Sequence, residues 1–309
     1  MKRLRTDKKG SEKVAYVFPG QGSQTVGMGK DIYNSSEAAR KVFKTADESL
    51  GFSLSKLCFD GPAEQLNLTC MAQPAILTTS LAYWEANKEK GYWKQFGSPV
   101  YTAGHSLGEY TALVAAKVVD FPEAIRLVWE RGCAMHQAGN QVPGGMVAVL
   151  GMEENELREI CRETNTDIAN INCPGQIIIS GSLGAIEKAV ALAKQHGARK
   201  TIFLNVSGAF HCGLMEPAII ELNKAIESTP FRDPEFPIIG NVNAMPITRA
   251  AELKRELHEQ LCHCVQWQKS IEYMIQNEVS TFIEVGPGRV LTGLIKRINT
   301  GVSTLGVPA

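Results

Sequence analysis

The sequence lacks any long apolar run and any excess of charge of one sign. No stretch of its 309 residues reaches the roughly 18 consecutive apolar residues that a membrane-spanning helix needs. Its first residues, MKRLRTDKKGSEK, contain no apolar segment of a secretory signal. Thirty-two basic residues balance 32 acidic ones, which argues against binding to nucleic acid or an anionic membrane through overall charge. We therefore expect a globular protein of the cytoplasm, with neither a nucleic-acid nor a membrane partner.

The sequence also lacks the cysteine spacing of a disulfide framework. Its eight cysteines are scattered, with no Cys-x-x-Cys pair, a pattern typical of reduced thiols. One local cluster could supply metal ligands: His258, Cys262, His263 and Cys264. A structural zinc site needs a second pair of ligands at workable spacing, and none is evident. We therefore expect no metal.

What is present is enough apolar material for a core. Hydrophobic residues make up 44% of the chain, and its length predicts one large or two modest domains. Residues 1–13 carry six basic and two acidic side chains. A short charged segment of this kind is typical of a disordered tail, so we expect the folded part to begin at Val14.

Short apolar strands alternate with helical segments through most of the chain. The pattern predicts strands at 14–18 and 100–103, with helices at 37–50, 73–89, 109–119 and 121–137. Pro74 is expected in the first turn of its helix, where a missing amide costs little. Alternation of this kind favours a parallel sheet covered by helices.

The middle of the chain has a different order of elements. The sequence predicts a strand at 145–150, a helix at 153–163, strands at 168–172 and 177–180, a helix at 185–196 and a strand at 200–206. The order βαββαβ is that of the ferredoxin-like unit. We expect a small domain at 141–206, inserted into a larger one formed by 14–140 and 207–309.

The strongest chemical signal is Gly104-His105-Ser106-Leu107-Gly108, between a predicted strand and a predicted helix. This is the setting of a nucleophile elbow, in which a tight turn projects the serine oxygen away from the sheet. The amide of Leu107, at the start of the new helix, can stabilise an oxyanion. The expected fold class is therefore α/β, an α/β-hydrolase-like core with a parallel sheet plus the inserted ferredoxin-like small domain.

A serine nucleophile needs a base, and six histidines compete for that role. His105 adjoins the serine, but in an elbow its side chain points away. His136 and His196 fall on predicted helices. His211 follows a predicted strand, where catalytic loops usually emerge, and leads the others on position alone.

A glycine-rich loop, Phe18-Pro-Gly-Gln-Gly-Ser-Gln24, follows the first predicted strand. It lacks the third glycine of a dinucleotide fingerprint and the Gly-Lys-Ser/Thr of a phosphate-binding loop. Such a loop at the end of a strand can instead offer a second amide to an oxyanion.

Several separate motifs together resemble one family. They are residues 18–24, Gln73-Pro-Ala75, Gly104-His-Ser-Leu-Gly-Glu-Tyr110, Arg131-Gly132, Asn172-Cys-Pro-Gly-Gln176, Phe210-His211, Val265-Gln-Trp267 and Glu284-Val-Gly-Pro-Gly288. These motifs occur in the same order as in malonyl-coenzyme A:acyl carrier protein transacylases, which the chain resembles over nearly all of residues 14–298.

The resemblance implies a reaction and its participants. Ser106 attacks the thioester of malonyl-coenzyme A, His211 accepts its proton, and the amides of Gln21 and Leu107 hold the oxyanion. The phosphopantetheine thiol of acyl carrier protein then takes the malonyl group, in a ping-pong cycle that supplies fatty-acid synthesis. No cofactor is bound, the substrate is a coenzyme A thioester, and the protein is expected to be a monomer.

The resemblance also assigns roles around the two reacting residues. Arg131 binds the free carboxylate of malonate, since a planar guanidinium makes two parallel charge-assisted hydrogen bonds. The main-chain carbonyl of Gln266 orients His211, and Asn172 lies near the site on the small domain. Phe210, together with Leu107, accompanies a preference for malonyl over methylmalonyl groups.

Three other functions stay open at this point. A free-standing acyltransferase that loads polyketide carrier proteins is the nearest. A serine hydrolase of acyl thioesters would share the elbow, although neither Asp120 nor Asp167, the aspartates between the serine and His211, sits in a convincing motif. A non-catalytic module that binds coenzyme A or a carrier protein is the third.

Overall fold

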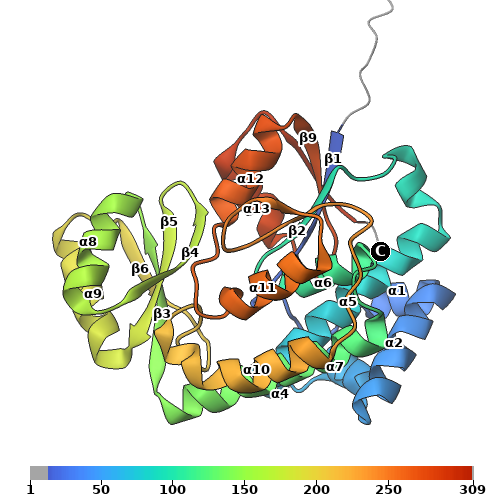
Figure 1. The fold of residues 1–309 in the computed structure, drawn as a ribbon, viewed down its shortest axis with the longest axis horizontal. Helices are drawn as coiled ribbons and strands as arrows, with labels where there is room; N and C mark the ends of the chain where they lie inside the picture. The colour runs from blue at the N-terminus through green and yellow to red at the C-terminus, as the bar shows by residue number, and fades with distance from the viewer. Residues whose placement is uncertain (1–12, 308–309) are drawn as a thin grey trace, which may run out of the picture.

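Two β-sheets organise the part of the chain that the structure describes, residues 13–307 of this computed structural model (Figure 1). The tail expected at 1–13 lies outside the described residues except for Lys13, which opens the first strand. The larger sheet has six strands and the smaller has four. Both are covered by helices, which confirms the expected α/β class.

The larger sheet is parallel except at one edge. Its order is β10 (Ser303–Gly306), β9 (Val279–Glu284), β1 (Lys13–Phe18), β2 (Tyr101–Gly104), β7 (Ile238–Ile239) and β8 (Pro246–Ile247), with only β8 antiparallel to its neighbour. The apolar run of β1 is buried on both faces, as strands in the middle of a parallel sheet are. Phe18 pairs with Gly104, so β1 and β2 end side by side. The loops that follow them therefore emerge at the same edge of the sheet.

Helices from both halves of the chain pack around this sheet (Figure 1). Those before the small sheet are α1 (Lys30–Ser35), α2 (Glu37–Leu50), α3 (Leu54–Asp60), α4 (Ala63–Leu66), α5 (Thr69–Glu89), α6 (Leu107–Ala115) and α7 (Phe121–Gln141), with the short 3₁₀ helix η1 (Tyr92–Gln95). Those after it are η2 (Gly213–Met215), α10 (Glu216–Ser228), α11 (Ala250–Gln260), α12 (Trp267–Gln276) and α13 (Val290–Ile298). The buried aliphatic and aromatic residues between the sheet and these helices form the main core.

The smaller sheet is built from one continuous segment, at the left of Figure 1. Its elements follow the predicted βαββαβ order: β3 (Gly144–Leu150), α8 (Glu154–Thr164), β4 (Asp167–Cys173), β5 (Gln176–Ser182), α9 (Leu183–Gln195) and β6 (Lys200–Phe203). The strands pair antiparallel in the order β4-β5-β3-β6, which confirms the ferredoxin-like arrangement. The backbone of Val265, beyond the small sheet in sequence, bonds to both Ala169 and Ile171 of β4 and joins it to the rest of the molecule.

One predicted helix start is wrong. Helix α5 begins at Thr69, not at residue 73, so Pro74 lies inside the helix and not in its first turn. The extra turn is stabilised by tertiary contacts that the local sequence does not reveal. The Thr69 side chain is buried and its hydroxyl contacts Ser207, 138 residues away, at 2.8 Å. The helix thus begins one turn before the proline, although Pro74 has no backbone donor.

Two further features of residues 13–307 bear on the expectations from sequence. All eight cysteines fall in this range and are free thiols. Within the same range, no helix is both long and apolar enough to cross a bilayer.

Candidate active site

Ser106 occupies a strained turn between β2 and α6. Its backbone has φ 51° and ψ −107°, a conformation that residues with a side chain seldom adopt. The turn is tight enough to require glycine on both sides. A Cβ on Gly104 would lie 1.8 Å from the carbonyl carbon of Gly108, and a Cβ on Gly108 would lie 2.0 Å from the carbonyl oxygen of Phe18. Strain of this kind is typical of a nucleophile held out from a sheet.

The side chain of Asn241, which follows the neighbouring strand β7, holds this turn in place through two hydrogen bonds. The residue follows β7, and its side chain is buried. Its Oδ1 accepts a hydrogen bond from the amide of Ser106 at 2.7 Å, and its Nδ2 donates to the carbonyl of Gly104 at 2.7 Å. Both backbone groups of the strained turn are therefore held by one side chain from another part of the sheet.

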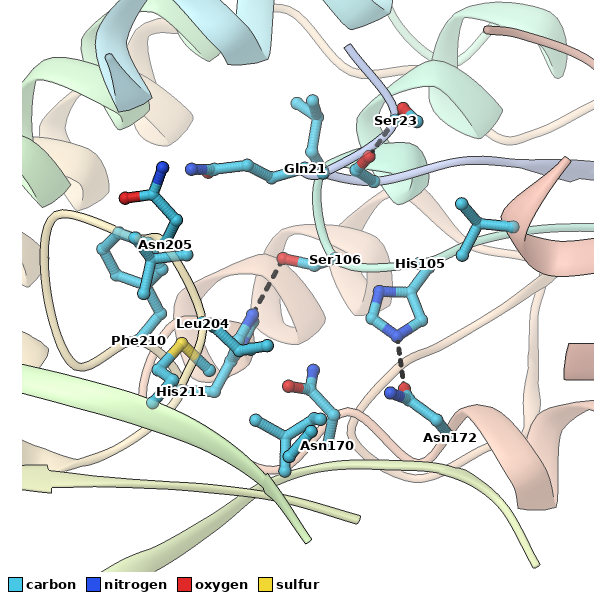
Figure 2. Close-up of a pocket in the computed structure, with 18 of the residues that line it drawn as sticks. Gln21, Ser23, His105, Ser106, Asn170, Asn172, Leu204, Asn205, Phe210 and His211 are labelled. Atoms are coloured by element: carbon cyan, nitrogen blue, oxygen red, sulfur yellow. Dashed lines mark hydrogen bonds between the residues drawn. The ribbon is translucent and has the colours of Figure 1, made fainter. Parts of the chain in front are cut away.

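The structure brings Ser106 and His211 into contact (Figure 2). The Ser106 Oγ atom lies 2.8 Å from Nε2 of His211, which comes from the loop after β6. The Nδ1 atom of His211 lies 2.9 Å from the main-chain carbonyl oxygen of Gln260. With Nδ1 donating to that carbonyl, Nε2 is left to accept the serine proton.

The expected role of Gln266 is wrong, because the carbonyl that orients His211 belongs to Gln260 at the end of α11. Gln266 lies at the start of α12, directly after the strand-like contact of Val265 with β4. The main-chain amide of Gln266 donates to the main-chain carbonyl of Asn241 at 2.8 Å. Gln266 thus helps to fix the junction between the two sheets, and the hydrogen bonds of the histidine ring go to Ser106 and Gln260 instead.

His105 turns away from the serine, as its place in the elbow predicts (Figure 2). Its Nε2 atom lies 2.8 Å from Oδ1 of Asn172 on β4, so Asn172 contacts the elbow through His105 and not through Ser106. The hydrogen bond joins the small sheet to the turn that carries Ser106.

Burial keeps the His211 ring neutral. The side chain is 4% exposed, and removal from water together with the nearby charge of Arg131 lowers the pKa of His211 from 6.5 to about 3. The carbonyl of Gln260 opposes this shift in part, since it stabilises the protonated ring. At neutral pH the imidazole is therefore available as a proton acceptor.

Arg131 lies on α7 with its guanidinium buried beside Ser106. Its exposed fraction is 1%. Nη1 donates to Oε1 of Gln73 at 2.6 Å, and Nη2 donates to Oε1 of Gln260 at 2.9 Å and to Oγ of Ser106 at 3.2 Å. All three partners are uncharged. A buried cation with neutral partners is costly, and an anionic group of a substrate would offset that cost.

Ser106, His211 and Arg131 line a cavity of about 500 Å³ between the two sheets. Gln21, Leu107 and Phe210 contribute to its wall, together with Asn172 from the small sheet. Leu107 is the first residue of α6, where a helix leaves its amides without intrahelical acceptors. The Gln21 side chain points across the cavity, and its Nε2 donates to Thr69 Oγ1 at 3.3 Å (Figure 2).

Four buried polar residues of this site were not assigned from the sequence: Gln73, Glu109, Asn241 and Gln260. Gln73 and Glu109 stand inside motifs that carry the family resemblance, which was the available signal for them. Asn241 follows a strand of two residues, and Gln260 ends a helix with no motif, so nothing local marks either of them.

The cluster considered for metal binding is not assembled as a site. His258 makes contacts with Asn223 and Glu227 on α10 at 2.6 and 2.8 Å. Within residues 13–307, no three histidine, cysteine, aspartate or glutamate side chains are grouped so as to hold a metal ion.

Comparison with known proteins gives concordant matches. The family described as acyl transferase domain matches residues 15–304. The chain is 45% identical over 300 residues to a malonyl CoA-acyl carrier protein transacylase of Bacillus subtilis, covering 96% of this chain and 93% of that protein. A crystal structure of an acyl carrier protein S-malonyltransferase from Vibrio cholerae superposes with a TM-score of 0.91 at 41% identity, with 96% of each chain covered. A structure of a malonyl-transacylase in complex with the acyl carrier protein of a type II polyketide synthase gives a TM-score of 0.89 at 39% identity, again with 96% of each chain covered.

Proposed function

Because the chain belongs to the acyl transferase family of malonyl-coenzyme A:acyl carrier protein transacylases, we propose that it moves a malonyl group from malonyl-coenzyme A to acyl carrier protein. One observation carries the choice of acyl group. The buried guanidinium of Arg131 has only uncharged hydrogen-bond partners, and one of them is the oxygen of Ser106. An acyl group with a free carboxylate close to its thioester supplies the missing negative charge.

The first half-reaction forms an ester on Ser106. Its Oγ attacks the thioester carbonyl of malonyl-coenzyme A while Nε2 of His211 takes the proton, as the 2.8 Å contact allows. The main-chain amides of Leu107 and Gln21 stabilise the oxyanion of the tetrahedral intermediate. His211 then gives its proton to the sulfur atom, and coenzyme A leaves as the thiol.

The second half-reaction runs the same steps in reverse with a different thiol. The phosphopantetheine thiol of acyl carrier protein loses its proton to His211 and attacks the malonyl ester. Collapse of the intermediate releases malonyl-carrier and returns the proton to Ser106. The substrate is a coenzyme A thioester, and these steps need no bound cofactor.

We also propose a two-domain organisation that fits this chemistry. Residues 14–140 and 207–309 would form the large domain, and residues 141–206 the small one. Residues of both proposed domains line the cavity: Ser106 and Arg131 belong to the large domain, and Asn170 and Asn172 lie on β4 of the small one. The acyl group would react at the junction between the two.

Intact-mass spectrometry after exposure to malonyl-coenzyme A tests the proposal. We expect one malonyl group on Ser106, none on Ser106→Ala, and transfer of that group when phosphopantetheinylated carrier is added. Ser23→Ala is the matched control, because this buried cavity hydroxyl donates to the carbonyl of Gly20 and has no contact with His211. Free malonate without malonyl-carrier would identify a hydrolase, and an unlabelled protein would identify a binding module.

The source of the carrier protein is a separate question. We propose the carrier of fatty-acid synthesis, and the similar structure with a polyketide carrier favours a second candidate. Comparing kcat/KM for the two carriers decides between them, and the carrier with the higher value identifies the pathway.

A further inference from the structure

Glu109 is a buried carboxyl that the proposed chemistry does not use. It lies in the first turn of α6, and its side chain has no exposed surface. Its Oε2 atom accepts a hydrogen bond from Nε2 of Gln260 at 2.6 Å, and its Oε1 atom has no partner among the described residues. An apolar side chain would fill this space without the cost of desolvating a carboxyl. We therefore look for the role of the Glu109 carboxyl in its hydrogen bond to Gln260.

Its hydrogen-bond partner, Gln260, also contacts Ser106, Arg131 and His211. The Nε2 atom of Gln260 also donates to the carbonyl of Ser106 at 3.1 Å, and Oε1 accepts from Nη2 of Arg131 at 2.9 Å. The main-chain carbonyl of the same residue holds Nδ1 of His211 at 2.9 Å. A shift of Gln260 would displace the guanidinium and the imidazole together.

We propose that Glu109 is a positioning residue for malonyl transfer, holding the Gln260 amide in the orientation that places Arg131 and His211 beside Ser106. The role rests on the proposed function of the site. An amide group can rotate by half a turn and exchange its oxygen and nitrogen atoms. In the rotated state the NH₂ group of Gln260 would face the donor Nη2 of Arg131. Glu109 Oε2 and the carbonyl of Ser106 both accept from the NH₂ group in the observed state, and the rotated amide would turn its oxygen toward the Ser106 carbonyl, so the pair of acceptors disfavours rotation.

The direction of the pKa shift of Glu109 is compatible with this role. Burial and the neighbouring carboxyl of Glu256 on α11 raise the pKa of Glu109 well above its ordinary value of 4.5. The guanidinium of Arg131 on α7 and the Gln260 hydrogen bond oppose that shift without cancelling it. The raised pKa favours the protonated form, and a protonated carboxyl still accepts from Gln260 through its carbonyl oxygen. It also leaves the positive charge of Arg131 unmatched, so that the substrate carboxylate can take that place.

Two substitutions distinguish the hydrogen-bond acceptor of Glu109 from its ability to carry a charge. Glu109→Gln is neutral and keeps an acceptor oxygen, whereas Glu109→Leu removes the acceptor. Thr111→Val is the matched control, because Thr111 is buried on the same helix and its hydroxyl has no hydrogen-bond partner within the described chain. For each folded variant, rapid-quench kinetics would measure acylation by malonyl- and acetyl-coenzyme A across pH.

We expect Glu109→Leu to lose on the order of 100-fold in kcat/KM for malonyl-coenzyme A, as displacement of a reacting group by about 1 Å can cause. Its preference for malonyl over acetyl should fall as well, which general loosening of the core would not produce. Glu109→Gln and Thr111→Val should keep the activity, the preference and the pH profile of the parent protein. Retention of the malonyl preference in Glu109→Leu would overturn the positioning role.

A second measurement applies even where Glu109→Leu does not fold. Infrared difference spectra of the parent protein against Glu109→Gln at neutral pH should contain the carbonyl band of a protonated carboxyl. A carboxylate band in its place, or loss of activity in Glu109→Gln, would show that the neutral state is wrong. Failure of the parent protein to take up malonate would instead contradict the proposed function, so the two failures are distinguishable.

Discussion

The Nη2 atom of Arg131 lies 3.2 Å from the Oγ atom of Ser106, so the cation contacts the proposed nucleophile. A carboxylate held by this guanidinium is therefore close to the attacking oxygen. Only a short chain between carboxylate and thioester lets both ends fit at once, and in malonate that chain is one methylene group. The same contact links binding to reactivity, because a bound carboxylate offsets the charge that disfavours protonation of His211.

Replacing Arg131 should change the acyl preference more than the reactivity of the serine. Arg131→Ala leaves a bound malonyl carboxylate buried and unpaired, which costs about 3 kcal/mol and corresponds to about a hundredfold in kcat/KM. Acetyl transfer has no carboxylate to lose, so its relative rate should improve. Arg131→Lys should recover only part of the malonyl activity, because one ammonium group cannot make two parallel hydrogen bonds. An unchanged ratio of malonyl to acetyl acylation in Arg131→Ala would contradict the assignment.

The acid limb of the pH profile should lie well below the ordinary pKa of histidine. The pKa of His211 is lowered from 6.5 to about 3, so its ring stays neutral as pH falls through 6.5 and gains a proton only near pH 3. Single-turnover acylation, measured as kcat/KM against pH, should therefore show no loss of rate centred near pH 6.5. A limb near 6.5 would mean that the ring is solvated or paired differently in solution.

The lowered pKa of His211 also sets the direction in which folding stability changes with pH. The unfolded chain takes up a proton at this histidine near pH 6.5, and the folded chain does so only near pH 3. The contribution of His211 to folding is thus lost as pH falls through this window. Compared with the parent protein, His211→Asn should show a smaller decrease of Tm between pH 6.5 and pH 4.

The elbow glycines should be intolerant of any side chain. A Cβ on Gly108 would lie 2.0 Å from the carbonyl oxygen of Phe18, so Gly108→Ala must separate α6 from β1. We expect a loss of about 3 kcal/mol in the free energy of unfolding. Gly293→Ala is the control, since Gly293 lies within α13 with no atom within 4 Å of a new Cβ, and the change should stabilise by about 0.5–1 kcal/mol. Equal Tm values for the two variants would contradict the tight turn.

Gln21 should act through its main chain. Gln21→Ala keeps the amide proposed for the oxyanion and removes only the side-chain hydrogen bond to Thr69. Acylation by malonyl-coenzyme A should therefore change little. Loss of an oxyanion donor typically costs about 3 kcal/mol, so a fall of about a hundredfold would show that the side chain is the donor.

Much of this molecule follows from local sequence. The apolar run of β1 and the order βαββαβ predict a parallel sheet and a ferredoxin-like unit because strands and helices bury their apolar residues at different periods. Gly104 and Gly108 around Ser106 predict the elbow because only glycine fits so tight a turn. These properties depend on residues close together in the chain, which is why the sequence alone was sufficient to predict them.

The tertiary structure decided which distant groups meet. The histidine is oriented by the carbonyl of Gln260 and not by that of Gln266, a difference of six residues that depends on where α11 ends. The extra first turn of α5 depends likewise on the contact of Thr69 with Ser207. Hydrogen bonds of this kind join segments more than 40 residues apart. Their partners are set by the packing of whole helices against the sheets, and no local pattern of residue types encodes that packing.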